Sequence, residues 1–292
     1  MPPRMSQSNN SRAFAAAVVA AATMGTLGFF VREAPCSAPL CGFARFAVGL
    51  LLLLPLVLWR SARGAKVWAF SWQAALSGIG IGVCILFYFL AMRCTTIALA
   101  VLLVYTGPVL ASIGEALLNR RMPPLRDGLL LVVSAAGLAL VCAGGDAEHS
   151  ANGLGACYSL ISALGYAVYL LCNSHMPEEV GLMRRTFWQF SAGCLFAAVP
   201  LALSASPWAG LGQSWGWLLA IGACHGFVVM LLIVYAARRL SSIQYGTIAY
   251  LEPAVAVAIG CLLYGELLLP LQWVGFALVI AASLAPSLLP RR

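Results

Sequence analysis

The stretch from Leu40 to Trp59 is LCGFARFAVGLLLLLPLVLW, in which Arg45 is the one charged residue. A helix that crosses the hydrocarbon core of a bilayer needs roughly 20 predominantly apolar residues, and this stretch supplies them. A strand of a membrane β-barrel would instead alternate apolar and polar residues, and the part from Val48 to Trp59 does not alternate. The stretch therefore predicts a transmembrane helix.

The whole chain has the same character. Of its 292 residues, 62% are hydrophobic and 9% are charged, whereas about a quarter of the residues in a soluble domain are charged. Such a chain cannot build a water-facing surface, but helices satisfy their own backbone hydrogen bonds within lipid. We predict an all-α integral membrane protein with ten transmembrane helices. The predicted helices are Phe14–Val31, Leu40–Trp59, Phe70–Ala91, Thr95–Leu118, Gly128–Ala143, Asn152–Cys172, Met183–Leu203, Ser214–Ala237, Ile243–Tyr264 and Leu271–Leu289.

The distribution of Lys and Arg predicts the orientation, because cytoplasmic loops retain these residues. With the N and C termini both cytoplasmic, the inner side receives most of the 17 basic residues, and only Arg32 and Arg93 fall outside. The loop from Gly144 to Ala151, which carries acidic residues, then lies outside as this scheme requires. We predict a multi-pass protein of the bacterial inner (plasma) membrane. The net charge of +8 reflects this topology, and because the basic residues are spread over loops and both termini we expect no nucleic-acid partner.

The cysteines do not indicate a metal centre. All 10 are scattered, with no Cys-x-x-Cys motif and no Cys/His cluster at the spacing of metal ligands. Cys36 and Cys41 lie near the predicted outer face, where they are candidates for a disulfide. The chain also lacks HExxH and an intramembrane pair of aspartates, so we expect no catalytic residue and no enzyme activity.

The chain repeats itself once. Residues separated by a constant 145 positions match between the two halves without a gap, and they include prolines, an arginine and a tyrosine that composition does not readily supply. The matches are Pro55 with Pro200, Ala75 with Ala220, Arg93 with Arg238, Tyr105 with Tyr250 and Pro108 with Pro253. We predict two five-helix repeats, residues 1–146 and 147–292.

Because five is an odd number, the second repeat enters the membrane from the opposite side, and the two repeats have inverted topology. Inverted repeats are a recurring architecture of secondary transporters, whose substrate site lies near the midplane between the repeats. Two similar halves can exchange conformations and so open one central site alternately to either face. The structural alternative is a duplication that only enlarges the bundle.

Three short motifs carry a resemblance that covers nearly the whole chain. They are Tyr105-Thr106-Gly107-Pro108, Tyr250-Leu251-Glu252-Pro253 and Gly265-Glu266. With them the chain resembles the drug/metabolite transporter superfamily, in its EamA-domain branch. Members usually carry Gly-Glu at the end of the fourth helix of each repeat, and the first repeat departs from this with Asn119-Arg120. The resemblance implies a transporter similar to bacterial exporters of aromatic and neutral amino acids.

Polar side chains within the membrane are costly, so each is a candidate for a functional role. Glu252 lies near the middle of the ninth predicted helix beside Pro253, and its carboxylate is suited to binding a substrate ammonium or to carrying a proton. His225, near the middle of the eighth helix, is suited to donating to a substrate carboxylate or to titrating during transport. For both residues, a hydrogen bond to a neighbouring helix is the structural alternative.

Side chains that combine a flat apolar face with a polar group are typical of small-molecule sites. Besides Glu252 and His225, the candidates for substrate binding are Tyr88, Tyr105, Tyr166, Trp188, Gln189, Tyr245 and Tyr250. The alternative for such aromatic residues is a place in the lipid belt or in helix packing. Gly78, Gly80 and Gly82, in the third predicted helix, either let another backbone approach closely or make room for a bulky substrate.

Three further charged residues lie near helix ends. Glu115 and Glu266 are candidate gates at opposite mouths, or partners of basic neighbours. Arg45 lies about one turn inside the outer end of the second helix, and we expect its side chain to snorkel outward to water. A transporter of phosphorylated substrates would need more cationic groups than Arg45 supplies.

We therefore expect a secondary transporter that exports small metabolites, in particular amino acids including aromatic or neutral ones, through a midplane cavity. Export of cationic or amphipathic drugs or other metabolites is one alternative, and a passive channel is another. The expected partners are a small-molecule substrate and the lipid bilayer. We expect a monomer, with neither a metal nor a cofactor.

Overall fold

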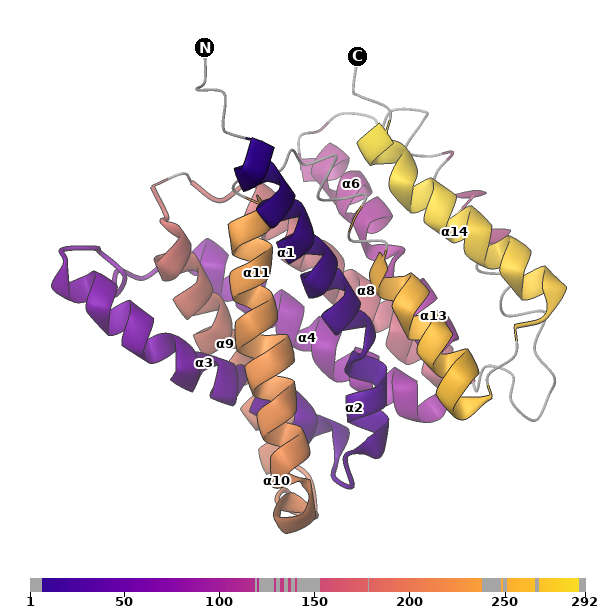
Figure 1. The fold of residues 1–292 in the computed structure, drawn as a ribbon, viewed down its shortest axis with the longest axis horizontal. Helices are drawn as coiled ribbons and strands as arrows, with labels where there is room; N and C mark the ends of the chain where they lie inside the picture. Colours follow the sequence, from indigo (N-terminus) through magenta and orange to yellow (C-terminus); the bar gives the residue numbers. More distant parts are fainter. Residues whose placement is uncertain are drawn as a thin grey trace.

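The computed structural model is a bundle of helices, and none of the residues that it describes forms a strand (Figure 1). It describes residues 7–118, 153–177, 179–237, 251–265 and 268–288, with isolated positions between 120 and 140 and at 248. Most of the predicted fifth helix, Gly128–Ala143, and the first part of the predicted ninth helix lie outside the described residues.

The described helices follow the predicted order along the chain. Those of the first half are α1 (Gln7–Gly25), α2 (Leu27–Glu33), α3 (Ala38–Ala62), α4 (Trp72–Cys94), α5 (Ile97–Val104) and α6 (Gly107–Leu118). Those of the second half are α8 (Gly153–Ser174), α9 (Leu182–Ala202), α10 (Leu211–Ala220), the π-helical segment η1 (Ile221–Val228), α11 (Val229–Ala237), α13 (Leu251–Tyr264) and α14 (Pro270–Leu288). In Figure 1, α1 begins and α14 ends at the upper edge of the bundle.

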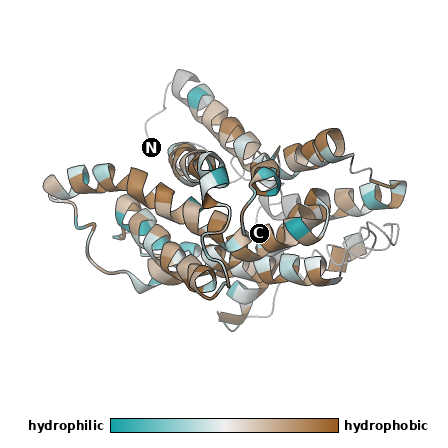
Figure 2. Cartoon of the chain, turned by 90° about the horizontal axis from the view of Figure 1, so that it is seen from below, coloured by the Kyte–Doolittle hydropathy of each residue, from teal (hydrophilic) through white to brown (hydrophobic). Residues whose placement is uncertain are grey.

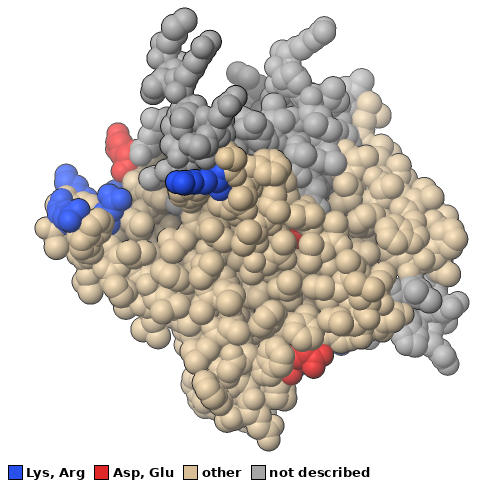
Figure 3. Space-filling view, viewed as in Figure 1, with Lys and Arg blue, Asp and Glu red and all other residues tan. Residues whose placement is uncertain are grey.

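Five segments are long and apolar enough to cross a membrane. They are Ser11–Glu33, Ala38–Ala62, Trp72–Cys94, Gly153–Ser174 and Leu211–Ile233. Each corresponds to a predicted helix, with ends that differ by a few residues. Large apolar side chains face outward on these and other helices: Leu51 is 64% exposed and Leu195 is 72% exposed. Figure 2 shows that hydrophobic residues occur along most of the helices, and in Figure 3 the charged side chains lie mainly near the edges of the visible face. Such a surface is stable in lipid and unfavourable in water.

Side-chain caps mark where several helices begin. The hydroxyl groups of Ser37, Ser71 and Thr96 accept hydrogen bonds from the backbone N–H groups three residues later, at 3.3, 3.4 and 3.2 Å. An N-cap of this kind satisfies one of the N–H groups that a helix leaves without an intrahelical partner. The short loops before α3, α4 and α5 therefore end at capping residues.

Two of the predicted helices are interrupted, and a third contains a π-helical segment. The predicted helix Thr95–Leu118 breaks between α5 and α6, where Pro108 lacks the N–H that would continue the hydrogen-bond ladder and Thr106 Oγ1 donates to the carbonyl oxygen of Leu103 at 2.7 Å. The first predicted helix breaks at Thr26, between α1 and α2. The eighth contains η1, and π-helical turns inside a helix occur frequently at functional sites.

The two halves pack mainly against each other. In the order of the repeat, α1 corresponds to α8, α3 to α9, and α4 to the continuous helix α10–η1–α11, while α13 corresponds to α5 and α6. The contact between α4 and α8 has its counterpart in the contact between α11 and α1, and that between α4 and α9 has its counterpart between η1 and α3. The contacts of α5 and α6 with α8 match that of α13 with α1. The main contacts between the two halves therefore occur in equivalent pairs among the described residues, as expected for two similar halves.

Glycines allow the closest of these contacts. A Cβ atom on Gly80 of α4 would lie 2.9 Å from the backbone nitrogen of Tyr169, and one on Gly165 of α8 would lie 2.7 Å from the carbonyl oxygen of Gly80. Gly82 faces the Phe196 ring at 2.9 Å, and Gly78 lies against the backbone of α9 at Gln189. Small residues let membrane helices approach to backbone contact.

Candidate functional site

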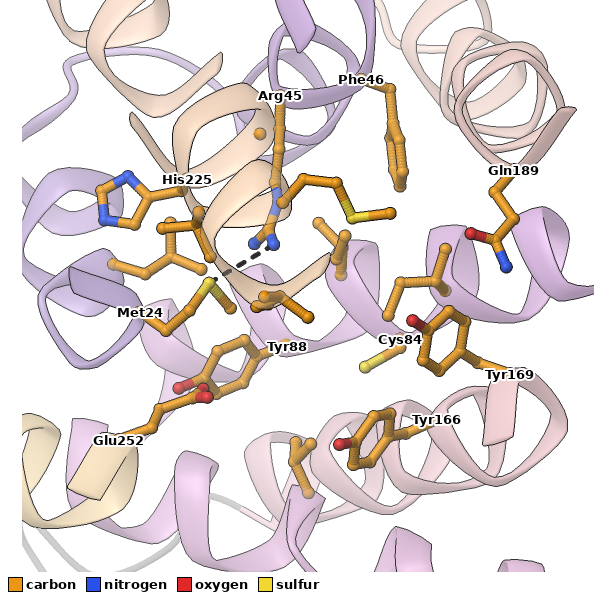
Figure 4. Close-up of a pocket in the computed structure, with 18 of the residues that line it drawn as sticks. Met24, Arg45, Phe46, Cys84, Tyr88, Tyr166, Tyr169, Gln189, His225 and Glu252 are labelled. Atoms are coloured by element: carbon orange, nitrogen blue, oxygen red, sulfur yellow. Dashed lines mark hydrogen bonds between the residues drawn. The ribbon is translucent and has the colours of Figure 1, made fainter. Parts of the chain in front are cut away.

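A cavity of 320 Å³ lies between the two halves of the bundle, with contributions from α1, α3, α4, α5, α8, α9, η1, α11 and α13 (Figure 4). Its wall is mostly apolar, and a few polar side chains converge on it, which is the usual composition of a small-molecule site. The polar side chains that line it include Arg45, Tyr88, Tyr105, Tyr166, Tyr169, Gln189, His225 and Glu252. The cavity therefore draws its polar groups from both halves of the chain.

The structure brings six of the predicted binding residues to this cavity. They are Tyr88, Tyr105, Tyr166, Gln189, His225 and Glu252. Trp188 does not line the cavity: its indole N–H donates to the carbonyl oxygen of Ala69 at 3.0 Å, and its ring packs edge-on against Phe70 with centroids 5.0 Å apart. Tyr245, Tyr250 and Glu266 lie outside the described residues.

The remaining predicted residues have other positions. Glu115 lies in the last turns of α6 and does not line the cavity. Gly78, Gly80 and Gly82 lie at contacts of α4 with α8 and α9, and none of them is a lining residue. These glycines set the distance between the helices that form the wall.

Gln189 is held by a hydrogen-bond network between three helices. Its Nε2 donates to Ser77 Oγ on α4 at 3.0 Å and to Asn173 Oδ1 on α8 at 2.9 Å, and Asn173 Nδ2 donates to the same Ser77 oxygen at 2.7 Å. Ser77 is completely buried. Because both N–H groups of the Gln189 amide are used in this network, its carbonyl oxygen is the atom that remains to accept a hydrogen bond from a ligand.

His225 lies on η1 and is held against the break between α1 and α2. The hydroxyl group of Thr26 donates to the carbonyl oxygen of Thr23 at 2.7 Å, so its oxygen accepts from His225 Nε2 at 3.1 Å. This assigns the proton of a neutral imidazole to Nε2. Nδ1 is buried and has no hydrogen-bond partner among the described residues. The break in the first predicted helix thus positions a residue of the opposite half.

Glu252 projects from the first turn of α13 towards the cavity (Figure 4). Its carboxylate is a hydrogen-bond partner of the Tyr105 hydroxyl group. Tyr105 lies at the interruption between α5 and α6. The fourth helix of one repeat and its counterpart in the other therefore meet at this pair. The break between α5 and α6 therefore lies beside the cavity, and broken helices of this kind are a feature of transporter substrate sites.

Arg45 does not point outward, and this corrects the expectation that it snorkels to water. Its guanidinium group lines the cavity, and Figure 4 shows it directed towards the space between His225 and Tyr88. The hydrogen bond that the structure gives this group, among the described residues, runs from Nη2 to the thioether sulfur of Met24 at 3.6 Å, and a thioether is a weak acceptor. The guanidinium group thus lies among the few polar side chains of the cavity and does not reach the bilayer surface.

Sequence reasoning also missed Tyr169, Phe46 and Met24. Tyr169 lies three residues after Tyr166, a spacing that places both on one face of a helix, and their rings stack with centroids 6.1 Å apart. That spacing was a usable signal. Phe46 and Met24 are apolar residues within predominantly apolar stretches, and no sequence signal separates them from lipid-facing neighbours.

No group of His, Cys, Asp and Glu that could hold a metal ion occurs within the described residues. The described part of the cavity offers one cationic and one carboxylate side chain, several phenol groups, an amide and an imidazole. This inventory is suited to binding a small polar molecule by hydrogen bonds and charge.

Comparisons with known proteins agree on the type of protein. The EamA-like transporter family model matches residues 11–143 and 153–286, once in each half. An uncharacterized transporter of Archaeoglobus fulgidus is 26% identical over 276 residues, which cover 92% of this chain and 94% of that protein. The threonine/homoserine exporter RhtA of Escherichia coli is 27% identical over 222 residues, 74% of this chain and 70% of that protein.

A crystal structure shares the fold. It superposes with a TM-score of 0.59 over 95% of this chain and 97% of that chain, at 19% sequence identity. The predicted resemblance is confirmed by the family match in both halves and by the transporters among the relatives. The chain is a multi-pass membrane protein that belongs to the EamA-like transporter family.

Proposed function

We propose that this protein is a secondary transporter that exports small metabolites, in particular amino acids including aromatic or neutral ones, from the cytoplasm across the bacterial inner membrane. The substrate binds in the central cavity, which opens alternately to the two sides of the membrane. The observation that carries the proposal is a cavity of 320 Å³ between the halves, lined by aromatic rings and a few convergent polar groups. That volume is at the lower end of the range for small-molecule sites.

The proposed topology has ten transmembrane helices in two inverted repeats, residues 1–146 and 147–292, with both termini in the cytoplasm. The start of α1 and the end of α14 at one edge of the bundle support an even number of crossings. In Figure 3 the Lys and Arg side chains on the visible face lie in its upper half, towards that same edge. The positive-inside rule then favours a cytoplasmic location for this edge.

The proposed mechanism uses the symmetry of the helix contacts. If the two halves exchange conformations, each contact between them is replaced by its counterpart, so the inward-open and outward-open states have similar packing energies. The interruptions at Thr26 and at Tyr105–Thr106 provide places where a helix can bend without losing many backbone hydrogen bonds. The cavity residues on both sides of these interruptions remain attached to rigid helical segments.

Counterflow in proteoliposomes tests the proposal. Vesicles that contain the purified protein and an excess of unlabelled L-threonine or L-phenylalanine are diluted into the labelled amino acid. A carrier accumulates the label transiently because its return is coupled to exit of the unlabelled substrate. Equal entry of label into preloaded and empty vesicles would contradict alternating access and favour a channel. Absence of any amino-acid transport, with transport of amines or other metabolites instead, would contradict the proposed substrate class.

A substitution tests the role of the cavity. Glu252→Gln keeps the size of the side chain and removes its charge, so we expect transport to fall while insertion and folding are unchanged. Glu179→Gln is the matched control, because Glu179 is exposed and lies outside the cavity. Measuring uptake with and without a pH gradient tests whether Glu252 or His225 carries a proton, and equal accumulation in the two conditions would reject coupling to protons.

A further inference from the structure

Two opposite charges face the same small cavity from different halves of the chain. Arg45 projects from α3 and Glu252 from α13, and both line the cavity (Figure 4). They are close enough to interact electrostatically, yet no ion pair joins them in the described part of the chain. Each charge lies in a mostly apolar wall, where a charge without a partner is unfavourable.

The hydrogen-bonding capacity of Arg45 is largely unused. A guanidinium group has five N–H donors arranged to hold a carboxylate through two parallel hydrogen bonds. Among the described residues, the hydrogen bond of this group is the weak one to Met24 Sδ. A ligand carboxylate would provide this group with strong acceptors, and a neutral ligand would not.

Glu252 has a different neighbourhood. Its carboxylate has the Tyr105 hydroxyl group as a hydrogen-bond partner, and Tyr88 lies beside it in the cavity wall. A carboxylate flanked by phenol rings is suited to binding a ligand ammonium group. The carboxylate accepts hydrogen bonds from the ammonium group, and the faces of aromatic rings attract a cation.

We propose that Arg45 and Glu252 form a two-point site for a zwitterion, in which Arg45 binds the carboxylate and Glu252 binds the ammonium group of an α-amino acid. This inference rests on the proposed function and narrows its substrate class to compounds that carry both groups unmodified. A ligand with one positive and one negative charge keeps the cavity neutral overall. An amine leaves Arg45 without an acceptor, and a carboxylic acid leaves Glu252 without a donor, so each analogue pays an electrostatic penalty that the amino acid avoids.

The test compares three compounds that share one side chain, as competitors of labelled amino-acid counterflow by the full-length protein in proteoliposomes. For L-phenylalanine they are the amino acid, 2-phenylethylamine and 3-phenylpropionate. For L-threonine they are the amino acid, 1-amino-2-propanol and 3-hydroxybutyrate. Loss of a charge-assisted contact is expected to weaken competition by about 10- to 100-fold, so both analogues should compete far less well than the amino acid.

The substitutions should change this pattern in opposite ways. Arg45→Gln should remove the advantage of the amino acid over the amine and keep its advantage over the acid, whereas Glu252→Gln should do the reverse. Arg45→Lys retains the charge without the planar fork and should lose only part of the preference. Arg60→Gln and Glu179→Gln are matched controls at exposed positions outside the cavity and should keep the wild-type pattern.

The outcomes separate the two proposals. If the wild-type protein carries neither amino acid in counterflow, the proposed function fails. If it carries them but either analogue competes as well as the amino acid, the function stands and the zwitterion site is wrong. Both substitutions could instead weaken competition by all three compounds equally, with a normal melting temperature and gel-filtration profile. In that case Arg45 does not bind the carboxylate and Glu252 does not bind the ammonium group specifically, and the inference is also overturned.

Discussion

Replacing Gly165 by alanine should destabilise the bundle. A Cβ atom at this position would lie 2.7 Å from the backbone nitrogen of Cys84 and 2.7 Å from the carbonyl oxygen of Gly80. Both contacts are with backbone atoms, which cannot move aside by a change of rotamer, so α8 and α4 must separate. Overpacking of this kind costs about 1–3 kcal/mol, against a gain of about 1 kcal/mol because alanine favours the helix more than glycine does.

The matched variant is Gly216→Ala. Gly216 is exposed in α10, and no atom lies within 4 Å of a Cβ added there, so this substitution gains the helix preference without the clash. The difference in free energy of unfolding between the two variants therefore measures the cost of the clash between α8 and α4. We expect Gly165→Ala to be less stable than Gly216→Ala by about 1–3 kcal/mol. Denaturation of the purified protein in mixed micelles, with thermal melting in detergent as a second measurement, checks this. Equal stability of the two variants would show that the α4–α8 contact does not depend on glycine.

Two further predictions concern polar contacts. Ser77→Ala removes the hydroxyl group to which Asn173 and Gln189 donate, so the variant should lose about 1–3 kcal/mol of stability and bind substrate more weakly in a competition assay; an unchanged melting temperature and affinity would contradict the role of the network. Cys36 and Cys41 have sulfur atoms 3.5 Å apart, and the hydrogen bond from the Cys41 thiol lowers the pKa of Cys36 from its usual 9.0 to about 6. Because the thiolate is the reactive form, treatment with diamide should join the two cysteines in a disulfide at a rate that rises through about pH 6; mass spectrometry of alkylated protein measures it, and a rate that rises only near pH 9 would contradict the shift.

The apolar runs predicted the helices well. A run such as Trp72–Cys94 has no alternative to a helix in lipid, since its backbone groups must be satisfied within the segment. The prolines at matching positions of the repeats also lie inside equivalent helices, Pro55 in α3 and Pro200 in α9. Hydropathy does not report whether a helix is continuous, and for that reason the interruption at Tyr105–Thr106 was missed although Pro108 marks it.

The rotation of each helix about its axis was harder to predict. Trp188 and Gln189 are neighbours in sequence and point about 100° apart on a helix. Gln189 lines the cavity, whereas Trp188 contacts Ala69 and Phe70. On a helix that is apolar on every side, the pattern of side chains does not indicate which side faces the partner. Arg45 was expected at the bilayer surface for a related reason. The sequence does not show that the side chain can reach other polar groups in a cavity between the helices.

The packing of first-half helices against second-half helices has a consequence for the biosynthesis of the protein. Helices enter the membrane in the order of synthesis, so α4 leaves the ribosome before its partners α8 and α9 exist. Its glycine face at Gly80 must meanwhile be covered by lipid or by the insertion machinery. The first half alone therefore cannot form the complete core of the bundle. The central cavity is complete only after α13, which carries Glu252, has been inserted.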